Sequence, residues 1–264
     1  MSEKALSELI SIMEKLRAPG GCPWDREQTT ESLVPFIIEE AYEVIAAIDA
    51  GSPDMLKDEL GDLLFQIIFL CQLAGEEGRF TMKDVIKGSV EKMVRRHPHV
   101  FADEKAENTE EVLKNWARIK KEERAADNGA IREGYLSGIP EQLPALLRAH
   151  KVTAKAARVG FDWKDIEGAF DKVDEEFGEF REAVRKRDGD NMEEEFGDIL
   201  FTLVNVGRFA EINPEDALRK TIGKFIGRFH FLEDDLRKRG QEIASTSPEE
   251  LEELWRKAKR EERK

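Results

Sequence analysis

The side chains of this chain best suited to chemistry are acidic, and they occur in pairs three residues apart. Glu40 and Glu43 form one pair, and Glu59 and Asp62 form the next. Residues three apart share one side of a helix, so each pair presents two carboxylates together. Four carboxylates on adjacent helices repel one another unless a cation neutralises them. Oxygen ligands suit a hard cation, so the pattern predicts a site for Mg²⁺, with Mn²⁺ as a possible substitute.

The acidic pattern recurs in the second half of the chain at a constant shift of 136 positions. The repeated residues are Glu176, Glu179, Glu195 and Asp198. A single pair of acids three apart is common on a solvated helix face and carries little weight. Glu59 and Asp62, however, interrupt a strongly apolar run that continues to Leu70, where unpaired charge is costly. Recurrence and apolar context together favour metal binding over a solvated acidic face.

Basic and aromatic side chains accompany both acidic patterns. They are Lys92, Arg95, Arg96, Trp116 and Lys120 in the first half, and Lys224, Arg228, Trp255 and Lys259 in the second. Arginine forks bind phosphate oxygens, lysine adds positive charge, and an indole ring offers a stacking surface for a base. Lysines are usually solvated, but the repeated Lys-Arg spacing of four residues favours anion binding.

Other common chemical motifs are missing from the sequence. His97 and His99 flank a proline without a nearby cysteine, so a turn role is favoured over a transition-metal site. Cys22 stands alone in its CPWD segment and is not a dithiol motif. The chain has no GxxxxGK[ST] or GxGxxG phosphate loop, and no ExxH of the di-iron type.

Helical hydrophobic spacing covers nearly the whole chain, so we predict an all-α fold with almost no β-structure. The expected helices span 4–17, about 31–35 to 50, 53–73, 81–96, 109–125, 141–158, 165–187, 191–210, 214–238 and 248–262. Gly51 ends the second helix, and Ser52 caps the third, with Pro53 at its first position. This short connection makes the second and third helices antiparallel neighbours. The third is apolar on more than one face, so it packs either within a core or against another copy.

The repeat divides the chain into two four-helix-bundle-type domains. We expect an N-terminal domain at 1–125, a linker at 126–144 that is rich in glycine and proline, and a C-terminal domain at 145–264. Trp116 and Trp255 extend the repeat with a shift of 139 positions. Each predicted domain thus carries one acidic pattern and one basic-aromatic set.

Composition limits the partners of the protein. The 264 residues include 42 basic and 56 acidic side chains, for a net charge of −14. We therefore expect no nucleic-acid partner and no anionic membrane surface. Two cysteines, no spanning apolar segment and no signal-peptide pattern favour a cytoplasmic protein. An anionic substrate would need a metal ion as a bridge to so acidic a chain.

Several segments resemble the MazG family of nucleoside triphosphate pyrophosphohydrolases, and together they span essentially the whole chain. They are GGCPWDREQT (20–29), IIEEAYEV (37–44), DELGDLLFQI (58–67), RRHPHVF (95–101), NWARIKKEE (115–123) and LPALLRAHKVTAKAARVGFDW (143–163). The combination is specific to this family. The bare ExxE…ExxD pattern is shared with other all-α nucleotide pyrophosphatases, including dimeric dUTPases.

The resemblance implies a homodimer whose four-helix bundles build each site, and Mg²⁺-dependent cleavage of a nucleoside triphosphate to a monophosphate and pyrophosphate. It implies that all eight acids hold Mg²⁺. It further implies nucleotide binding by Lys224, Arg228, Trp255 and Lys259, with Lys92, Arg96, Trp116 and Lys120 as counterparts. Family members can carry a lysine four residues before the third acid of the second domain. Here that residue is Asn191, which removes one phosphate contact.

The expected reaction is in-line attack of water on the α-phosphorus. Lys and Arg side chains would stabilise the pyrophosphate that leaves. A carboxylate beside the metal cluster would act as general base. Glu39 and Glu175 are the candidates, although each lies about 100° round the helix from the adjacent metal ligand. Which of the two domains works is left open by the sequence, because some family members use only one.

Two alternatives stay open at this point. One is a non-catalytic helical scaffold or partner-binding module, in which the acids form solvated faces. The other is a narrow deoxynucleoside triphosphate pyrophosphatase of the dUTPase type, because the acid motif says nothing about the shape of the base pocket. A broad substrate range would fit a role in controlling or cleaning the nucleotide pool.

Overall fold

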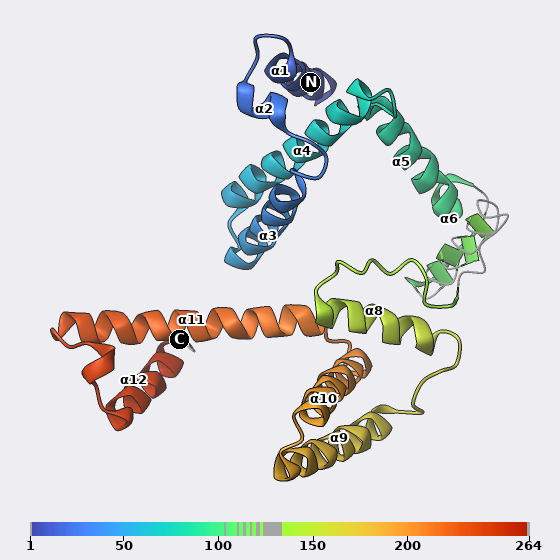
Figure 1. Cartoon of the computed structure of the whole chain (residues 1–264). Helices are drawn as coiled ribbons and strands as arrows, with labels where there is room; N and C mark the ends of the chain where they lie inside the picture. The colour runs from blue at the N-terminus through green and yellow to red at the C-terminus, as the bar shows by residue number, and fades with distance from the viewer. Residues whose placement is uncertain are drawn as a thin grey trace. The chain divides into compact units, whose positions relative to one another are not determined.

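The computed structural model describes residues 2–102, 104–109, 111–112, 115–116, 118–119, 122–123 and 134–262. These residues form helices and connecting turns, with no β-strand among them (Figure 1). The all-α prediction is therefore confirmed. The chain divides into two compact units, Met1–Gly129 and Ala130–Lys264. That division falls inside the expected linker, while the limits of the two expected domains stay a prediction.

The first unit begins with a short helical cap and a long helical hairpin. The helices of this unit whose bounds are described are α1 (Ser2–Arg17), α2 (Pro23–Glu27), α3 (Val34–Ala50), α4 (Pro53–Glu76), α5 (Met82–Arg96) and α6 (Pro98–Phe101). The helices α3 and α4 pack side by side, and α1 packs against α4 (Figure 1). The α3–α4 hairpin carries Glu40, Glu43, Glu59 and Asp62, the four acids of the predicted metal site in this half.

The connection between α3 and α4 follows the predicted turn chemistry. Gly51 has a φ of 62°, a left-handed conformation that favours glycine. The Ser52 side chain accepts a hydrogen bond from the Met55 backbone N–H at 3.4 Å, and Pro53 stands in the first turn. The tight turn brings the two acidic pairs to adjacent helices.

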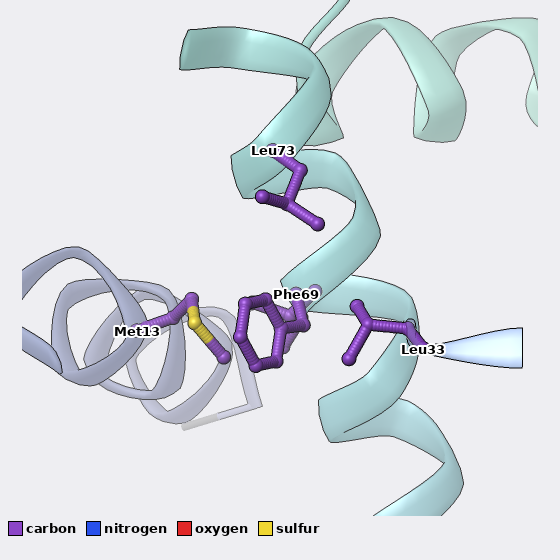
Figure 2. Close-up of a cluster of buried hydrophobic side chains, with 5 residues drawn as sticks. Met13, Leu33, Phe69 and Leu73 are labelled. Carbon is purple, nitrogen blue, oxygen red and sulfur yellow. The ribbon is translucent and has the colours of Figure 1, made fainter. Parts of the chain in front are cut away.

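A small apolar core fixes α4 against α1 and the chain before α3. Its buried side chains are Met13, Leu33, Ile68, Phe69 and Leu73 (Figure 2). The Arg17 guanidinium lies 5.5 Å from the centre of the Phe69 ring and forms a 2.6 Å ion pair with Glu76. This core holds the C-terminal half of α4, while Glu59 and Asp62 lie on its N-terminal half.

The second unit contains two helical hairpins, of which the first repeats the α3–α4 arrangement. Its helices are α8 (Ala145–Ala157), α9 (Ile166–Lys186), α10 (Gly189–Phe209), α11 (Pro214–Lys238) and α12 (Pro248–Glu261), with a 3₁₀ turn at Ile243–Ser245. The helices α9 and α10 pack as a pair, α8 packs against α10 and α11, and α11 packs against α12. The α11–α12 core is formed by Leu232, Leu236, Leu254 and Ala258.

The predicted helix ends were wrong at a few places. Helix α8 begins at Ala145 rather than 141, because Pro144 is its N-cap residue and has a ψ of 140°, outside the helical range. The short helices α2 and α6 were not predicted, since each is too short to show a hydrophobic period and is started by a proline. The helix predicted at 109–125 lies partly outside the described residues.

Both acid-bearing hairpins expose apolar side chains in the single chain. Leu60 is 48% exposed and Leu64 is 36% exposed on α4, and Phe196 and Leu200 are 52% and 40% exposed at the equivalent positions of α10. Leucine and phenylalanine are usually buried, so contiguous exposure marks a contact surface. Among the described helices, none is long and apolar enough to cross a membrane.

Candidate metal and nucleotide site

Three acids converge between α3 and α4 in the first unit. Glu40 and Glu43 on α3 and Glu59 on α4 each offer a carboxylate oxygen, and these oxygens lie within 4.8 Å of one another. Such spacing suits oxygen ligands around one small cation. The packing of the hairpin therefore brings together three of the four acids that the sequence predicted to converge.

Burial and mutual repulsion raise the pKa values of two acids in this first cluster. Burial raises the pKa of Glu40 above its ordinary value, and the neighbouring charge of Asp62 raises it further, while a hydrogen bond from Gln66 lowers it. The pKa of Glu59 is raised by desolvation first and then by the charge of Glu43. Burial and mutual repulsion both make the charged forms of these carboxylates costly. A divalent cation bound to their oxygens would offset that cost.

The same arrangement recurs between α9 and α10. Glu176, Glu179 and Glu195 offer oxygens within 4.8 Å of one another, and Glu176 is only 4% exposed. Desolvation raises the pKa of Glu195, and the charges of Glu179, Glu176 and Asp198 add to the increase. The residues present thus fit a hard divalent ion in this half as well.

The fourth acid of each predicted set lies at the edge of its cluster. Asp62 and Asp198 are exposed, and neither belongs to the group of oxygens within 4.8 Å. Both are close enough for their charges to raise the pKa of a clustered glutamate. The structure thus brings together three acids in each half, with the aspartate beside them.

Neither candidate general base belongs to the converging groups. Glu39 is exposed on α3. Glu175 on α9 accepts a 2.6 Å hydrogen bond from Lys172, whose ammonium also lies 2.9 Å from Glu176. Sequence reasoning missed Lys172, although its spacing of four residues from Glu176 is a signal that could have found it.

The basic residues of the first unit gather around one acidic side chain. The Arg96 Nη2 lies 2.5 Å from the Glu123 Oε2, and the Arg95 Nε lies 2.7 Å from the Glu123 Oε1. The Arg96 hydrogen bond is the main cause that lowers the pKa of Glu123 to about 2. A pocket of about 660 Å³ is lined here by Lys92, Arg95, Arg96, Arg118, Ile119 and Glu123, among others.

The aromatic member of this first set lies beside the histidine turn. Trp116 and His97 pack edge to face with ring centres 5.5 Å apart. His97 Nδ1 lies 2.7 Å from the Met93 carbonyl oxygen, at the junction of α5 and α6, in agreement with a turn role. Lys120, the remaining predicted member, lies outside the described residues.

The second unit places its basic and aromatic residues on the α11–α12 hairpin. The Arg228 Nη2 donates to the Glu262 Oε2 at 2.6 Å, and the guanidinium lies 5.7 Å from the centre of the Trp255 ring. Phe225 packs 5.0 Å from the same ring, measured between centres. Lys224 and Lys259 are exposed on these two helices.

An apolar pocket of about 390 Å³ lies beside Trp255. It is lined by Phe225, Phe229, Leu232, Ile243, Pro248, Leu251, Glu252 and Trp255. Aromatic and aliphatic walls of this kind suit a flat, weakly polar ring. The three converging acids, by contrast, belong to the α9–α10 pair, so the acid cluster and this apolar pocket lie on different helix pairs of the unit.

Glu123 and Glu262 were also missed by sequence reasoning. Each follows a lysine- and arginine-rich turn of helix, and the two positions differ by the same 139 residues as Trp116 and Trp255. Each binds the arginine of its own half, which gives both halves the same ion pair. The shared shift of 139 residues between Glu123 and Glu262 and between the two tryptophans is the sequence signal that could have identified these glutamates.

Both acid clusters lie within segments that match a known protein family. The MazG nucleotide pyrophosphohydrolase domain matches residues 28–101 and 166–230, which include both acid clusters. Nucleoside triphosphate pyrophosphohydrolase/pyrophosphatase MazG of Thermotoga maritima is 47% identical over 96% of this chain and 94% of its own length.

Two further relatives carry the name nucleoside triphosphate pyrophosphohydrolase. The Escherichia coli K12 protein is 45% identical over 97% of this chain and 98% of its own length. The Mycobacterium tuberculosis protein is 36% identical over 59% of this chain and 46% of its own length. With both acid clusters inside matched domains and near-complete coverage of two relatives, the chain belongs to the MazG nucleotide pyrophosphohydrolase family and carries its domain twice.

Proposed function

We propose that this protein hydrolyses nucleoside triphosphates to nucleoside monophosphates and pyrophosphate, with Mg²⁺ held by the acid clusters. The observation that carries the proposal is the convergence of three glutamate oxygens within 4.8 Å in each half. The names of the relatives from Thermotoga maritima and Escherichia coli support the reaction class. Breadth in base and sugar is part of the proposal, because the apolar walls beside Trp255 offer few groups for reading a base edge.

The carboxylates of each cluster would hold the ion in this reaction. Bound Mg²⁺ supplies positive charge that polarises the phosphoryl oxygens and offsets the charge of the triphosphate. Asp62 and Asp198 lie at the cluster edges, where they can orient water or complete the ligand set. Glu39 and Glu175 are proposed to take the proton of the attacking water, and this assignment rests on their place beside the cluster alone.

The basic and aromatic residues would bind the rest of the substrate. Arg228 presents its guanidinium beside the Trp255 ring, so one side chain can contact phosphate while the other stacks on the base. Lys224 and Lys259 add positive charge on the same hairpin. Arg95, Arg96, Lys92 and Trp116 are proposed to do the same in the first half, around the pocket beside Glu123.

A second copy of the chain is proposed to complete each site. Leu60, Leu64, Phe196 and Leu200 leave an apolar face on the acid-bearing hairpins. Pairing two such hairpins forms a four-helix bundle and buries these faces. Exposure of these apolar side chains to water is unfavourable in a single chain, and a homodimer would bury them.

A panel of ribo- and deoxynucleoside triphosphates, assayed with and without Mg²⁺ for monophosphate and pyrophosphate, tests the proposal. We expect Mg²⁺-dependent release of both products from several substrates. Cleavage of one deoxynucleotide only would favour the narrow, dUTPase-like alternative. Absence of product from every substrate would favour the scaffold alternative and contradict the proposal.

The acid clusters are tested by the isosteric variants Glu59→Gln and Glu195→Gln. Each is expected to abolish the activity of its own half while retaining helical content, because it removes a charged ligand without changing size. The double variant is therefore expected to be inactive. Wild-type activity in the double variant, measured by pyrophosphate release, would rule out the proposed metal ligands.

A further inference from the structure

The two acid clusters differ in one contact. In the second unit, the Lys172 ammonium lies 2.9 Å from the Glu176 Oε1 and 2.6 Å from the Glu175 Oε1. Glu176 is one of the three acids whose oxygens converge. The equivalent residue of the first unit is Phe36, which packs on the apolar core around Phe69. The repeat thus replaces an apolar side chain by a cation at one edge of an otherwise equivalent cluster.

The lysine supplies the charge that its cluster would otherwise lack. Glu176 is almost fully buried, and a buried carboxylate is costly without a partner. Glu175 and Glu176 together raise the pKa of Lys172 above its ordinary value, so the side chain is a cation at neutral pH.

Among the residues that the structure describes, no lysine or arginine forms an ion pair with Glu40, Glu43 or Glu59. Glu40, the counterpart of Glu176, accepts a hydrogen bond from the neutral amide of Gln66, and none of the causes that shift its pKa is a cation. Its pKa is raised by burial and by Asp62. The charge of the first cluster is therefore left for an external ion to neutralise.

We propose that Lys172 is a tethered cation that competes with the divalent ion at the second cluster, so that the two halves bind metal with different affinity. The inference rests on the metal sites of the proposed function. A divalent ion that takes an oxygen of Glu176 meets an ammonium 2.9 Å from that residue. Repulsion between the two cations weakens metal binding unless the lysine moves away. Without nucleotide, the first half binds the ion more tightly than the second.

Mn²⁺ binding to the nucleotide-free full chain tests this difference directly. The free ion is quantified by electron paramagnetic resonance at about pH 8, well above the ordinary carboxyl pKa. Glu195→Gln leaves only the first cluster intact, and Glu59→Gln leaves only the second. We expect the Mn²⁺ Kd of the second cluster to exceed that of the first by about tenfold, the order of effect of one adjacent unit charge in a partly exposed site.

Substitution of Lys172 then tests whether this residue causes the difference in Mn²⁺ affinity between the two clusters. In the Glu59→Gln background, Lys172→Met is expected to tighten Mn²⁺ binding by about tenfold, and Lys172→Arg is expected to leave it weak. Lys186→Met is the matched control, because Lys186 lies on the same helix but pairs with Glu182 at 3.3 Å. It removes the same charge away from the cluster and is expected to have no effect.

A reciprocal substitution tests the first half. Phe36→Lys in the Glu195→Gln background is expected to weaken Mn²⁺ binding, with circular dichroism used to verify that the helices remain. If Lys172→Met leaves the Kd unchanged, or changes it only as much as Lys186→Met does, the competition is refuted. If neither single-cluster variant binds Mn²⁺, the proposed metal sites themselves fail, and this inference fails with them.

Discussion

Replacing Trp255 by alanine should separate recognition of the base from recognition of the phosphates. The Trp255 ring lies 5.0 Å from the Phe225 ring and 5.7 Å from the Arg228 guanidinium, at one wall of the apolar pocket. Base stacking on an aromatic side chain is worth about 1–3 kcal/mol. Trp255→Ala should therefore weaken binding of a non-hydrolysable nucleoside triphosphate by about 5- to 150-fold.

Equilibrium dialysis in the Glu59→Gln background would measure this loss for the second half alone. Pyrophosphate is the matched ligand, because the proposal places it against Arg228 and it has no base. We expect its affinity to change less than about twofold in Trp255→Ala, since the phosphate contacts remain. Trp255→Phe should recover most of the nucleotide affinity, because it restores a stacking ring.

Two outcomes would refute the stacking role of Trp255. Unchanged nucleotide affinity in Trp255→Ala would place the base elsewhere. Equal losses for nucleotide and pyrophosphate would mean that the tryptophan acts by holding the α11–α12 hairpin together, since it packs on the core of Leu232, Leu236, Leu254 and Ala258.

Two further predictions concern acid stability and assembly. Glu123, whose pKa is lowered to about 2 by Arg96 and Arg95, contributes stability that is complete above its unfolded-state pKa of about 4.5 and is lost as pH falls towards 2. Glu123→Gln should therefore reduce the melting temperature more at pH 7 than near pH 2, where about half of the Glu123 carboxyl is protonated. An equal reduction at both values would contradict the ion pair. Leu60→Asp combined with Phe196→Asp should convert the proposed dimer to monomer in light scattering, because it places charge on both exposed apolar faces. A dimer that persists with wild-type affinity would show that these faces are not the interface.

The fold followed from the sequence because its signals are local. The α3–α4 hairpin is determined by local features: the helical hydrophobic period, Gly51 at the end of α3, and Ser52 and Pro53 at the start of α4. The repeat then extended the same hairpin to α9 and α10. The short helix α6 has no period of its own, because its place depends on Pro98 and on the end of α5.

The candidate site was predicted where spacing along one helix decides it. Glu40 and Glu43 on one helix, with Glu59 on the next, converge as expected, whereas Asp62, the fourth acid of the predicted set, lies outside the group. The approach of Glu123 to Arg96 depends on the angle between two elements distant in sequence, which helical periodicity does not encode. Lys172 was missed for a different reason. In the sequence, a lysine four residues from a glutamate looks like part of an ordinary solvated ion pair, and only the structure shows that Glu176 is buried.

The central claim, that the two acid clusters hold divalent ions, is tested most directly by anomalous scattering from crystals grown with Mn²⁺ and a non-hydrolysable nucleoside triphosphate. The account predicts manganese peaks within ligand distance, about 2.2 Å, of oxygens from Glu40, Glu43 and Glu59 or from Glu176, Glu179 and Glu195. Bound nucleotide with these carboxylates turned into solvent, and no manganese at either cluster, would contradict it.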